Sequence, residues 1–269
     1  MEEEQIRYEI MPSGAIVQDC EKLPTGHPVA VTMSTTYGVS RTMEVLKELA
    51  SQGYEVLPHI AARMIPDAET LENIHTQLEE YNISSVFIPG GDAETPAGPF
   101  ESSYELIRKL HDDFSPSYDV GITGYPEGHE FITDAELRDS IRKKCQLSDY
   151  IVSHICFSPS KINEWCDSLS EAGITLPVFC CVPTAMPRAK LQHISKLIGV
   201  GKSSHSLSSN SKPEVSANDP LYRPTKLIKQ LVATGQISGF HISTFNRLSA
   251  TRQFHRTHIA SESSIKLSS

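Results

Sequence analysis

Eight short apolar runs alternate with stretches of helical periodicity along this 269-residue chain, and this alternation limits the possible folds more than any other feature. Several runs, such as 29–34, are apolar at nearly every position, which is typical of strands covered on both faces. The alternation predicts an α/β fold, a single (β/α)8 barrel, with a doubly wound open sheet as the alternative. No G-x-G-x-x-G follows the first run, which disfavours the open sheet. The expected strands are 6–11, 29–34, 54–59, 85–88, 118–123, 150–157, 176–182 and 237–244.

The segments between these runs carry the apolar spacing of amphipathic helices. In 67–81, for example, Leu71, Ile74 and Leu78 recur three or four residues apart. Thr133 and Glu136 match the capping box that opens a helix. We expect each helix to follow its strand in the barrel. The expected helices are 41–52, 67–81, 101–111, one after 133–136, 160–172, 188–198, 221–234 and one from 247 onward.

One segment breaks the alternation. Residues 201–218 are rich in serine and almost free of apolar residues, which indicates a loop. Too little chain follows it for a second domain. We therefore expect one barrel over residues 1–260 that contains this loop, followed by a polar tail at 261–269.

The charge of the chain disfavours some partners. It carries 33 acidic and 24 basic residues, a formal net charge of −9, whereas nucleic acids and anionic membranes select basic surfaces. No apolar run approaches the ~20 residues of a membrane span, and the acidic start lacks the apolar region of a signal peptide. The six cysteines form no C-x-x-C pair, as expected for free thiols in a reducing compartment. We expect a cytoplasmic protein with a small-molecule partner, either monomeric or a homo-oligomer.

Polar side chains follow the expected strands at their carboxyl ends. In a barrel these ends converge on one mouth, where active sites lie, so the pattern favours an enzyme. Each residue also has a structural alternative, such as a core histidine for His59 or His154 and a plain turn for the Gly90-Gly91-Asp92 segment. The candidates are Glu9, Thr36, His59, Gly91, Asp92, Glu127, His129, His154, Asn246 and Arg247.

Two segments of the chain carry the strongest local signals. Glu9 lies on an otherwise apolar strand, where a carboxylate is costly unless it has a task or a partner such as a lysine or arginine. Glu127 and His129 lie in the loop after the fifth strand, which Gly124, Pro126 and Gly128 punctuate, and this indicates a sharp turn held at a strand end.

The order of motifs resembles the methylenetetrahydrofolate reductase family over residues 8 to about 254. The matching segments are Tyr8-Glu9-Ile10-Met11-Pro12, Thr35-Thr36-Tyr37-Gly38, Leu57-Pro58-His59, Gly90-Gly91-Asp92, Tyr125-Pro126-Glu127-Gly128-His129, the segment 167–183, and Phe240-His241 with Phe245-Asn246-Arg247. The Tyr-Pro-Glu-x-His stretch is the most specific of them. The resemblance implies a (β/α)8 barrel that reduces the methylene bridge of a tetrahydrofolate derivative to a methyl group.

The resemblance also implies roles for individual residues. Glu9 matches the general acid, whose pKa a partly dry pocket would raise, and Asp92 matches an aspartate that contacts the pterin near the flavin. Thr36, His59, Gly91 and His129 match the surroundings of an FAD cofactor, and Lys143 matches a lysine near its phosphates. Glu127, His154, Asn246 and Arg247 are the expected substrate contacts, and NAD(P)H is the expected source of electrons.

Several positions depart from the family pattern. Gly90 stands where the family has arginine, Ser102-Ser103 replaces Tyr-Ala, His154 replaces a glutamine, and Phe131 replaces a second glutamate. These departures affect mainly the expected binding of the flavin. The resemblance therefore leaves two sources of hydride open, bound FAD or a nicotinamide cofactor acting directly.

Two other functions compete with the reductase. A metal-dependent barrel hydrolase or lyase would use His59, Asp92, His129 and His154 as ligands. No H-x-H or similarly tight spacing supports it, so we expect no metal centre. A non-catalytic folate-binding relative would retain the fold with a decayed flavin site.

Overall fold

Eight parallel strands form the centre of the protein, in a computed structural model that describes residues 6–199, 203 and 221–258. The strand order is β3-β2-β1-β10-β7-β6-β5-β4. The bridge between His59 and Phe87 and the hydrogen bond from Ile60 N to Phe87 O (2.8 Å) join the two outer strands. The strands are β1 (Ile6–Ile10), β2 (Val29–Val31), β3 (Val56–Pro58), β4 (Ser85–Phe87), β5 (Asp119–Gly124), β6 (Tyr150–Ser153), β7 (Val178–Pro183) and β10 (Gly239–Ser243).

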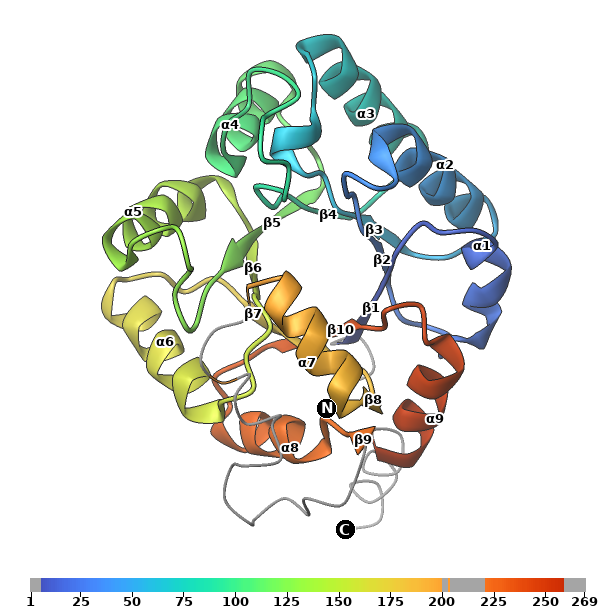
Figure 1. Ribbon diagram of the computed structural model, residues 1–269. Helices are drawn as coiled ribbons and strands as arrows, with labels where there is room; N and C mark the ends of the chain where they lie inside the picture. The colour runs from blue at the N-terminus through green and yellow to red at the C-terminus, as the bar shows by residue number, and fades with distance from the viewer. Residues whose placement is uncertain (1–5, 200–202, 204–220, 259–269) are drawn as a thin grey trace.

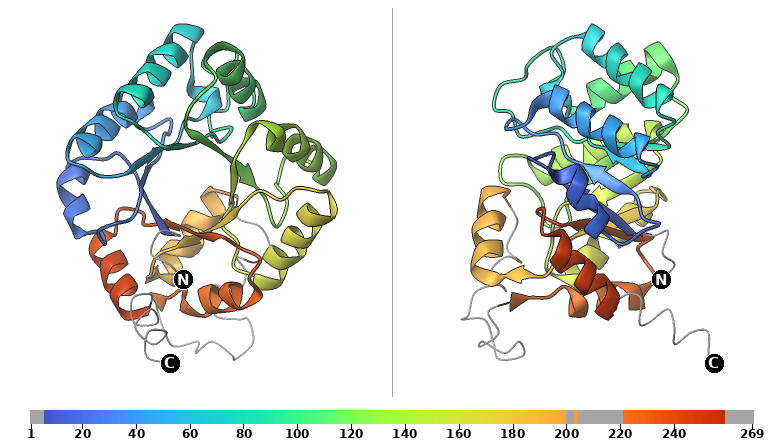
Figure 2. Two further views of the ribbon diagram at one scale, coloured as in Figure 1. Left: turned by 180° about the vertical axis from the view of Figure 1, so that it is seen from behind. Right: turned by 90° about the vertical axis from the view of Figure 1, so that its right-hand side faces the viewer.

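Helices surround this sheet on the outside, as Figure 1 and the two views of Figure 2 show. The predicted (β/α)8 barrel is therefore confirmed. The outer helices are α2 (Gly38–Ser51), α3 (Ala68–Glu80), α4 (Ser103–Phe114), α5 (Asp134–Lys144), α6 (Pro159–Glu171), α8 (Thr225–Thr234) and α9 (Leu248–His258). Short helical turns that the sequence did not predict are α1 (Ile16–Asp19), η2 (Cys20–Lys22), η3 (Ala62–Met64) and η4 (Cys145–Leu147).

Local sequence signals account for several helix starts. Thr133 and Glu136 form the predicted capping box at α5, and Ser102 with Glu105 forms a second one at α4. Helix α6 has Ser158 as its cap and Pro159 at its first position, where proline fits because no amide hydrogen is needed. No described helix has the length and hydropathy that a membrane span needs.

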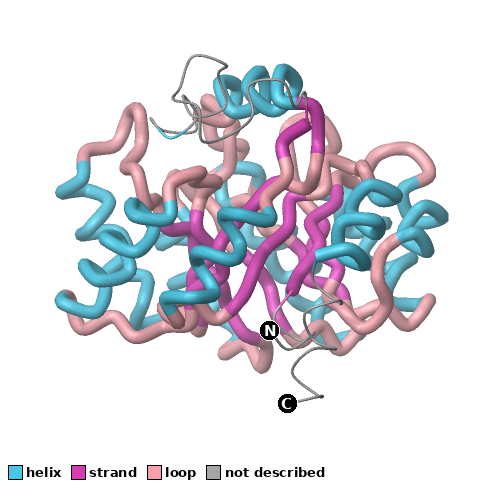
Figure 3. The backbone as a smooth tube through the Cα atoms, turned by 90° about the horizontal axis from the view of Figure 1, so that it is seen from below, coloured by secondary structure: helices cyan, strands magenta, loops and turns pink. Residues whose placement is uncertain are grey.

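Helix α7 (Arg188–Leu197) does not take the place that we expected for the helix after β7. Figure 3 shows it lying across one end of the barrel, on the side of the carboxyl ends of the strands, while α8 occupies the outer position between β7 and β10. A small antiparallel pair, β8 (Met186–Pro187) and β9 (Leu221–Tyr222), supports it. The expected helix 221–234 begins only at Thr225 because its first residues form β9.

The structure also shortens the sixth strand, which the sequence placed at 150–157. It ends at Ser153, opposite Gly124, because the neighbouring strand β5 ends there. Of the serine-rich loop 201–218, only Ser203 is among the described residues, and the tail 261–269 lies outside them. The boundaries of the single domain stay a prediction.

Alternation along the strands separates the barrel interior from its helix-covered outer face. On β1, Ile6, Tyr8 and Ile10 are buried in the core cluster shared with the helices, whereas Arg7 and Glu9 occupy the alternate, inward positions. The guanidinium of Arg7 lies between the rings of Tyr150 and Phe179, 4.1 and 3.7 Å from their centroids. Glu9 comes two residues later, one layer nearer to the carboxyl ends of the strands.

Candidate active site

Glu9 is held by residues of the neighbouring strand β10. Its Oε1 accepts a hydrogen bond from Ser243 Oγ (2.8 Å), and its Oε2 lies 3.2 Å from His241 Nε2. The register of the two strands explains the contacts, because Arg7 pairs with His241 and Glu9 with Ser243. The side chain of Glu9 keeps one-fifth of its surface exposed, whereas the side chain of His241 is buried. No lysine or arginine supplies the partner that was the structural alternative for Glu9; histidine and serine do, among the residues placed in the structure.

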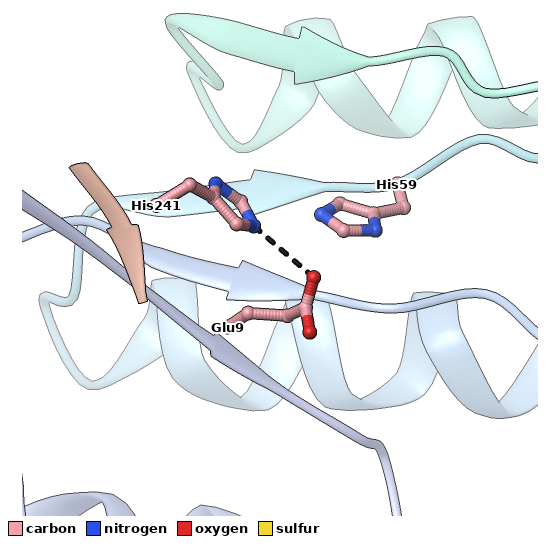
Figure 4. Close-up of side chains that lie close together, drawn as sticks. All are labelled: Glu9, His59 and His241. Carbon is pink, nitrogen blue, oxygen red and sulfur yellow. Dashed lines mark hydrogen bonds and ion pairs between the residues drawn. The ribbon is translucent and has the colours of Figure 1, made fainter. Parts of the chain in front are cut away.

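His59 completes a cluster with these groups. It follows β3, where its backbone closes the barrel, and its ring lies against Phe87 and His241 with centroids 4.8 and 5.5 Å away. Figure 4 shows its ring directed toward His241 and Glu9. Burial lowers the pKa of His59 to about 3, so its imidazole is neutral near pH 7.

The predicted rise in the pKa of Glu9 is wrong. Burial alone would raise this pKa, but the hydrogen bond and charge of His241, the nearby His59 and the hydrogen bond from Ser243 favour the carboxylate and lower it to about 2. The free protein therefore holds an ionised Glu9 at neutral pH. The sequence showed the apolar strand around Glu9 but not the donors that face it.

His241 and Ser243 were not predicted as site residues. The signal that points to them is the alternation of β10: Phe240 and Ile242 are buried in the core cluster with the helices, so His241 and Ser243 occupy the inward positions. The site residues predicted at this strand, Asn246 and Arg247, lie beyond its end.

The loop after β5 brings a second group of rings to the mouth. Tyr125 stacks on His154 with centroids 5.7 Å apart and meets His129 edge-on at 5.3 Å. Burial, with His129 nearby, lowers the pKa of His154, against a hydrogen bond with the backbone of Ile198 at the end of α7. Two predicted site residues, His129 and His154, are thus brought together through Tyr125, which was not among the predicted site residues.

Glu127 and Asn246 are engaged within the protein. Ser203 donates to both oxygens of Glu127, from its backbone N (2.9 Å) and its Oγ (2.5 Å). The side chain of Asn246 accepts from Met11 N (2.8 Å) and donates to Met11 O and Ser13 Oγ. Its φ of +56° is tolerated by asparagine better than by most residues. These contacts give both side chains a structural task at the mouth.

Arg247 follows Asn246 in the chain and immediately precedes α9. Its backbone N donates to Thr244 O (2.9 Å), and its Nε is buried with no hydrogen-bond partner among the described residues. A buried guanidinium nitrogen without a partner is costly, so Arg247 is the predicted substrate contact with the clearest capacity left to bind an anion.

The predicted flavin contacts fit a flavin dinucleotide poorly. Thr36, Asp92 and His129 are exposed at three separate strand ends. Lys143 lies in the last turn of α5, close to the start of β6, where its Nζ contacts Asp139 Oδ2 at 2.7 Å. At the predicted positions, no unpaired cation is available for the phosphates.

Neighbouring groups do not improve the fit. Gly91 has a φ of +94°, and an added Cβ would lie 3.0 Å from Ala61 Cβ, so chain packing accounts for this glycine. The guanidinium of Arg63, after β3, donates to the carbonyls of Ala93, Glu94 and Glu101. A surface cavity of about 440 Å³ beside Arg142 and Leu176 lies near the opposite end of the strands and borders none of the candidate residues.

Three side chains of the site have the donor types of a metal centre. Glu9, His59 and His241 each offer one ligand atom, and these atoms lie within 4.8 Å of one another. Of the four ligands expected for a metal-dependent hydrolase, only His59 belongs to this group, which is the one such group among the described residues.

Comparisons with known proteins bear on what this site does. The family model described as methylenetetrahydrofolate reductase matches residues 13–258. "Methylenetetrahydrofolate reductase 2" of Saccharomyces cerevisiae is 24% identical over 212 residues, which are 72% of this chain and 35% of that protein. "Probable methylenetetrahydrofolate reductase (NADPH)" of Caenorhabditis elegans is 21% identical over 214 residues, 75% of this chain and 32% of that protein. The chain thus spans about a third of the length of these relatives.

A solved structure supports the fold alone. The chain in "Complex structure of GH113 beta-1,4-mannanase" superposes with a TM-score of 0.51 at 12% identity, covering 94% of this chain and 99% of that one. Glu9 precedes the residues that the family model matches, so its role is inferred from its place at the carboxyl end of β1.

Proposed function

The chain belongs to the methylenetetrahydrofolate reductase family, and from this we propose that it is an oxidoreductase that converts 5,10-methylenetetrahydrofolate to 5-methyltetrahydrofolate, or catalyses the reverse reaction. The observation that carries the proposal is the family match along residues 13–258, on a barrel whose mouth holds a carboxylate between two histidines. The relatives are longer proteins, of which this chain matches only about a third, so their activity is proposed for this chain.

In this reaction Glu9 is the proposed proton donor to the folate nitrogen whose bond to the methylene group breaks. Because its carboxylate is ionised in the free protein, it must gain a proton before it can donate one. A bound folate would cover the exposed part of Glu9 and remove its water, which raises a carboxyl pKa. In the reverse direction the ionised carboxylate is already the form that accepts a proton.

We propose that the hydride comes directly from a nicotinamide nucleotide. The predicted flavin contacts Thr36, Asp92, His129 and Lys143 do not supply a site for a flavin diphosphate, and the name of the nematode relative specifies NADPH. Arg247, with its unpartnered Nε, is the proposed contact for an anionic group of the folate or the nucleotide. Asp92 and His154 remain proposed contacts of the pterin, and a cytoplasmic location remains part of the proposal because all six cysteines are free.

A non-catalytic folate-binding protein is the second candidate. The same poor fit of the flavin contacts favours it, together with the position of α7 across the mouth. The two candidates predict equal binding of folate but differ in turnover.

The test is a turnover assay with methylenetetrahydrofolate and NADH or NADPH, after a visible absorption spectrum taken with and without added FAD. We expect no flavin to remain bound, turnover with one of the two nucleotides, and a ~100- to 10,000-fold loss of turnover in Glu9→Gln, since general acid catalysis typically contributes 10²–10⁴-fold. Glu164→Gln, on the exposed face of α6, is the matched control. Bound flavin would refute direct transfer, and folate binding without turnover would select the second candidate.

A further inference from the structure

We infer that Glu9, His59 and His241 form a binding site for one divalent transition-metal ion. The three come from β1, from the residue after β3 and from β10, which lie together on one side of the barrel. Their ligand atoms are within 4.8 Å of one another before any ion is bound. An ion between them would draw these atoms to the ~2.0–2.2 Å that imidazole and carboxylate ligands keep from Zn²⁺.

An unused nitrogen points independently to a ligand. His59 is 6% exposed, and its Nε2 is buried with no hydrogen-bond partner among the residues that the structure describes. Figure 4 shows the ring facing Glu9 and His241. A buried polar atom without a partner costs about 1–3 kcal/mol, and an ion bound between the three groups would satisfy it.

The donor set and its surroundings indicate which ions bind. Two imidazoles with one carboxylate favour Zn²⁺, Fe²⁺, Co²⁺ or Ni²⁺ over Mg²⁺ and Ca²⁺, which prefer oxygen ligands. Ser243 Oγ holds the second oxygen of Glu9 at 2.8 Å, as outer hydrogen bonds orient ligating carboxylates elsewhere. Glu9 is one-fifth exposed, so positions not filled by the protein face the mouth.

Binding has a consequence that rests on the proposed function. A carboxylate bound to a metal ion cannot carry the proton that Glu9 is proposed to donate. The ion and folate reduction therefore exclude each other, and Zn²⁺ inhibits turnover until a chelator removes it.

The experiment measures the ion directly on the full chain. Chelator-treated protein is titrated with Co²⁺ and its d–d absorption is recorded, and Zn²⁺ is quantified by mass spectrometry after gel filtration. We expect one equivalent of each ion in the wild type. In His59→Gln and in Glu9→Gln, binding should weaken at least tenfold, while far-ultraviolet circular dichroism stays unchanged. His193→Gln, an exposed histidine of α7, controls for surface binding.

Substoichiometric binding to the wild type would overturn the inference, and so would undiminished binding in Glu9→Gln, which keeps both histidines. If His59→Gln unfolds because His59 closes the barrel, Glu9→Gln alone decides the outcome. Metal binding is read without any turnover, so a protein that binds Zn²⁺ and reduces no folate would disprove the proposed function and leave the site standing.

Discussion

Lys144 is a buried cation outside the candidate site. It lies in the last turn of α5 with 6% of its surface exposed, and its Nζ has Ser103 Oγ at 3.4 Å as its recorded hydrogen-bond partner. Burial lowers its pKa from 10.5 to about 8. The unfolded chain therefore binds this proton more tightly than the folded protein does, and the charged form destabilises the fold below pH 8.

We predict that Lys144→Met stabilises the protein at pH 7 by up to about 3 kcal/mol, the equivalent of this pKa difference. The advantage should shrink as the pH rises from about 8 to 10.5, because the wild-type lysine loses its charge in that window. Urea unfolding at several pH values measures the stability difference between the variant and the wild type. The contributions of the other titrating groups cancel in this difference. Lys143→Met, at an exposed neighbour paired with Asp139, should change stability by less than about 0.5 kcal/mol at any pH. A stability difference between Lys144→Met and the wild type that does not vary with pH would contradict the prediction.

Helix α7 shows what sequence periodicity leaves open at the scale of an element. The spacing of its apolar residues predicted the helix at 188–198, and the structure has it at Arg188–Leu197. Periodicity states that one face is buried but not which surface covers it. Here Leu191 packs with Met186 and Tyr222 of the β8–β9 pair, and Phe157 and Phe245 pack beside them at the mouth. That pairing joins residues more than 30 positions apart, which no local pattern reveals.

The same limit applies to the candidate site. Strand ends placed Glu9, His59 and His154 at one mouth, because parallel strands in a barrel leave no other arrangement. The partner of Glu9, however, depends on strand β10 and its register, about 230 residues away. Lys143 lies in the last turn of α5, about 15 Å from the start of the helix, because each residue lengthens an α-helix by about 1.5 Å. It is therefore distant from the other predicted flavin contacts.

We predict that α7 opens independently of the barrel. Leu191→Ala removes a fully buried side chain from a small cluster separate from the main core, so it should speed amide hydrogen exchange in residues 188–197 and leave exchange in the barrel strands unchanged. Leu231→Ala, on the barrel helix α8, should instead lower global stability by about 2–5 kcal/mol. Hydrogen-exchange mass spectrometry on both variants measures this. Equal acceleration in strands and α7 after Leu191→Ala would show that the helix belongs to the cooperative core.

At the scale of the whole molecule, large side chains of the barrel interior fill the space beside glycines, where any other residue would place a Cβ. A Cβ on Gly121 would lie 2.2 Å from the ring of Tyr150. That ring is fixed, because its hydroxyl donates to Val86 O (2.7 Å) and accepts from Ser85 Oγ (3.0 Å), and Arg7 covers its face. Strands β1, β4, β5 and β6 therefore depend on one packed layer, and an extra methyl group has nowhere to go.

We predict that Gly121→Ala destabilises the whole barrel by about 3 kcal/mol or more, at the upper end of what overpacking costs. Gly90→Ala is the matched control, since nothing lies within 4 Å of its added Cβ, and its stability should stay within about 0.5 kcal/mol of the wild type. The double variant Gly121→Ala/Tyr150→Leu tests the cause, because removing the ring should make the glycine substitution much cheaper than it is in the presence of Tyr150. Thermal and urea unfolding measure the wild type, Gly90→Ala, Gly121→Ala, Tyr150→Leu and the double variant. If the two substitutions are additive, the clash with Tyr150 is not what makes glycine necessary, and the layer does not couple the four strands.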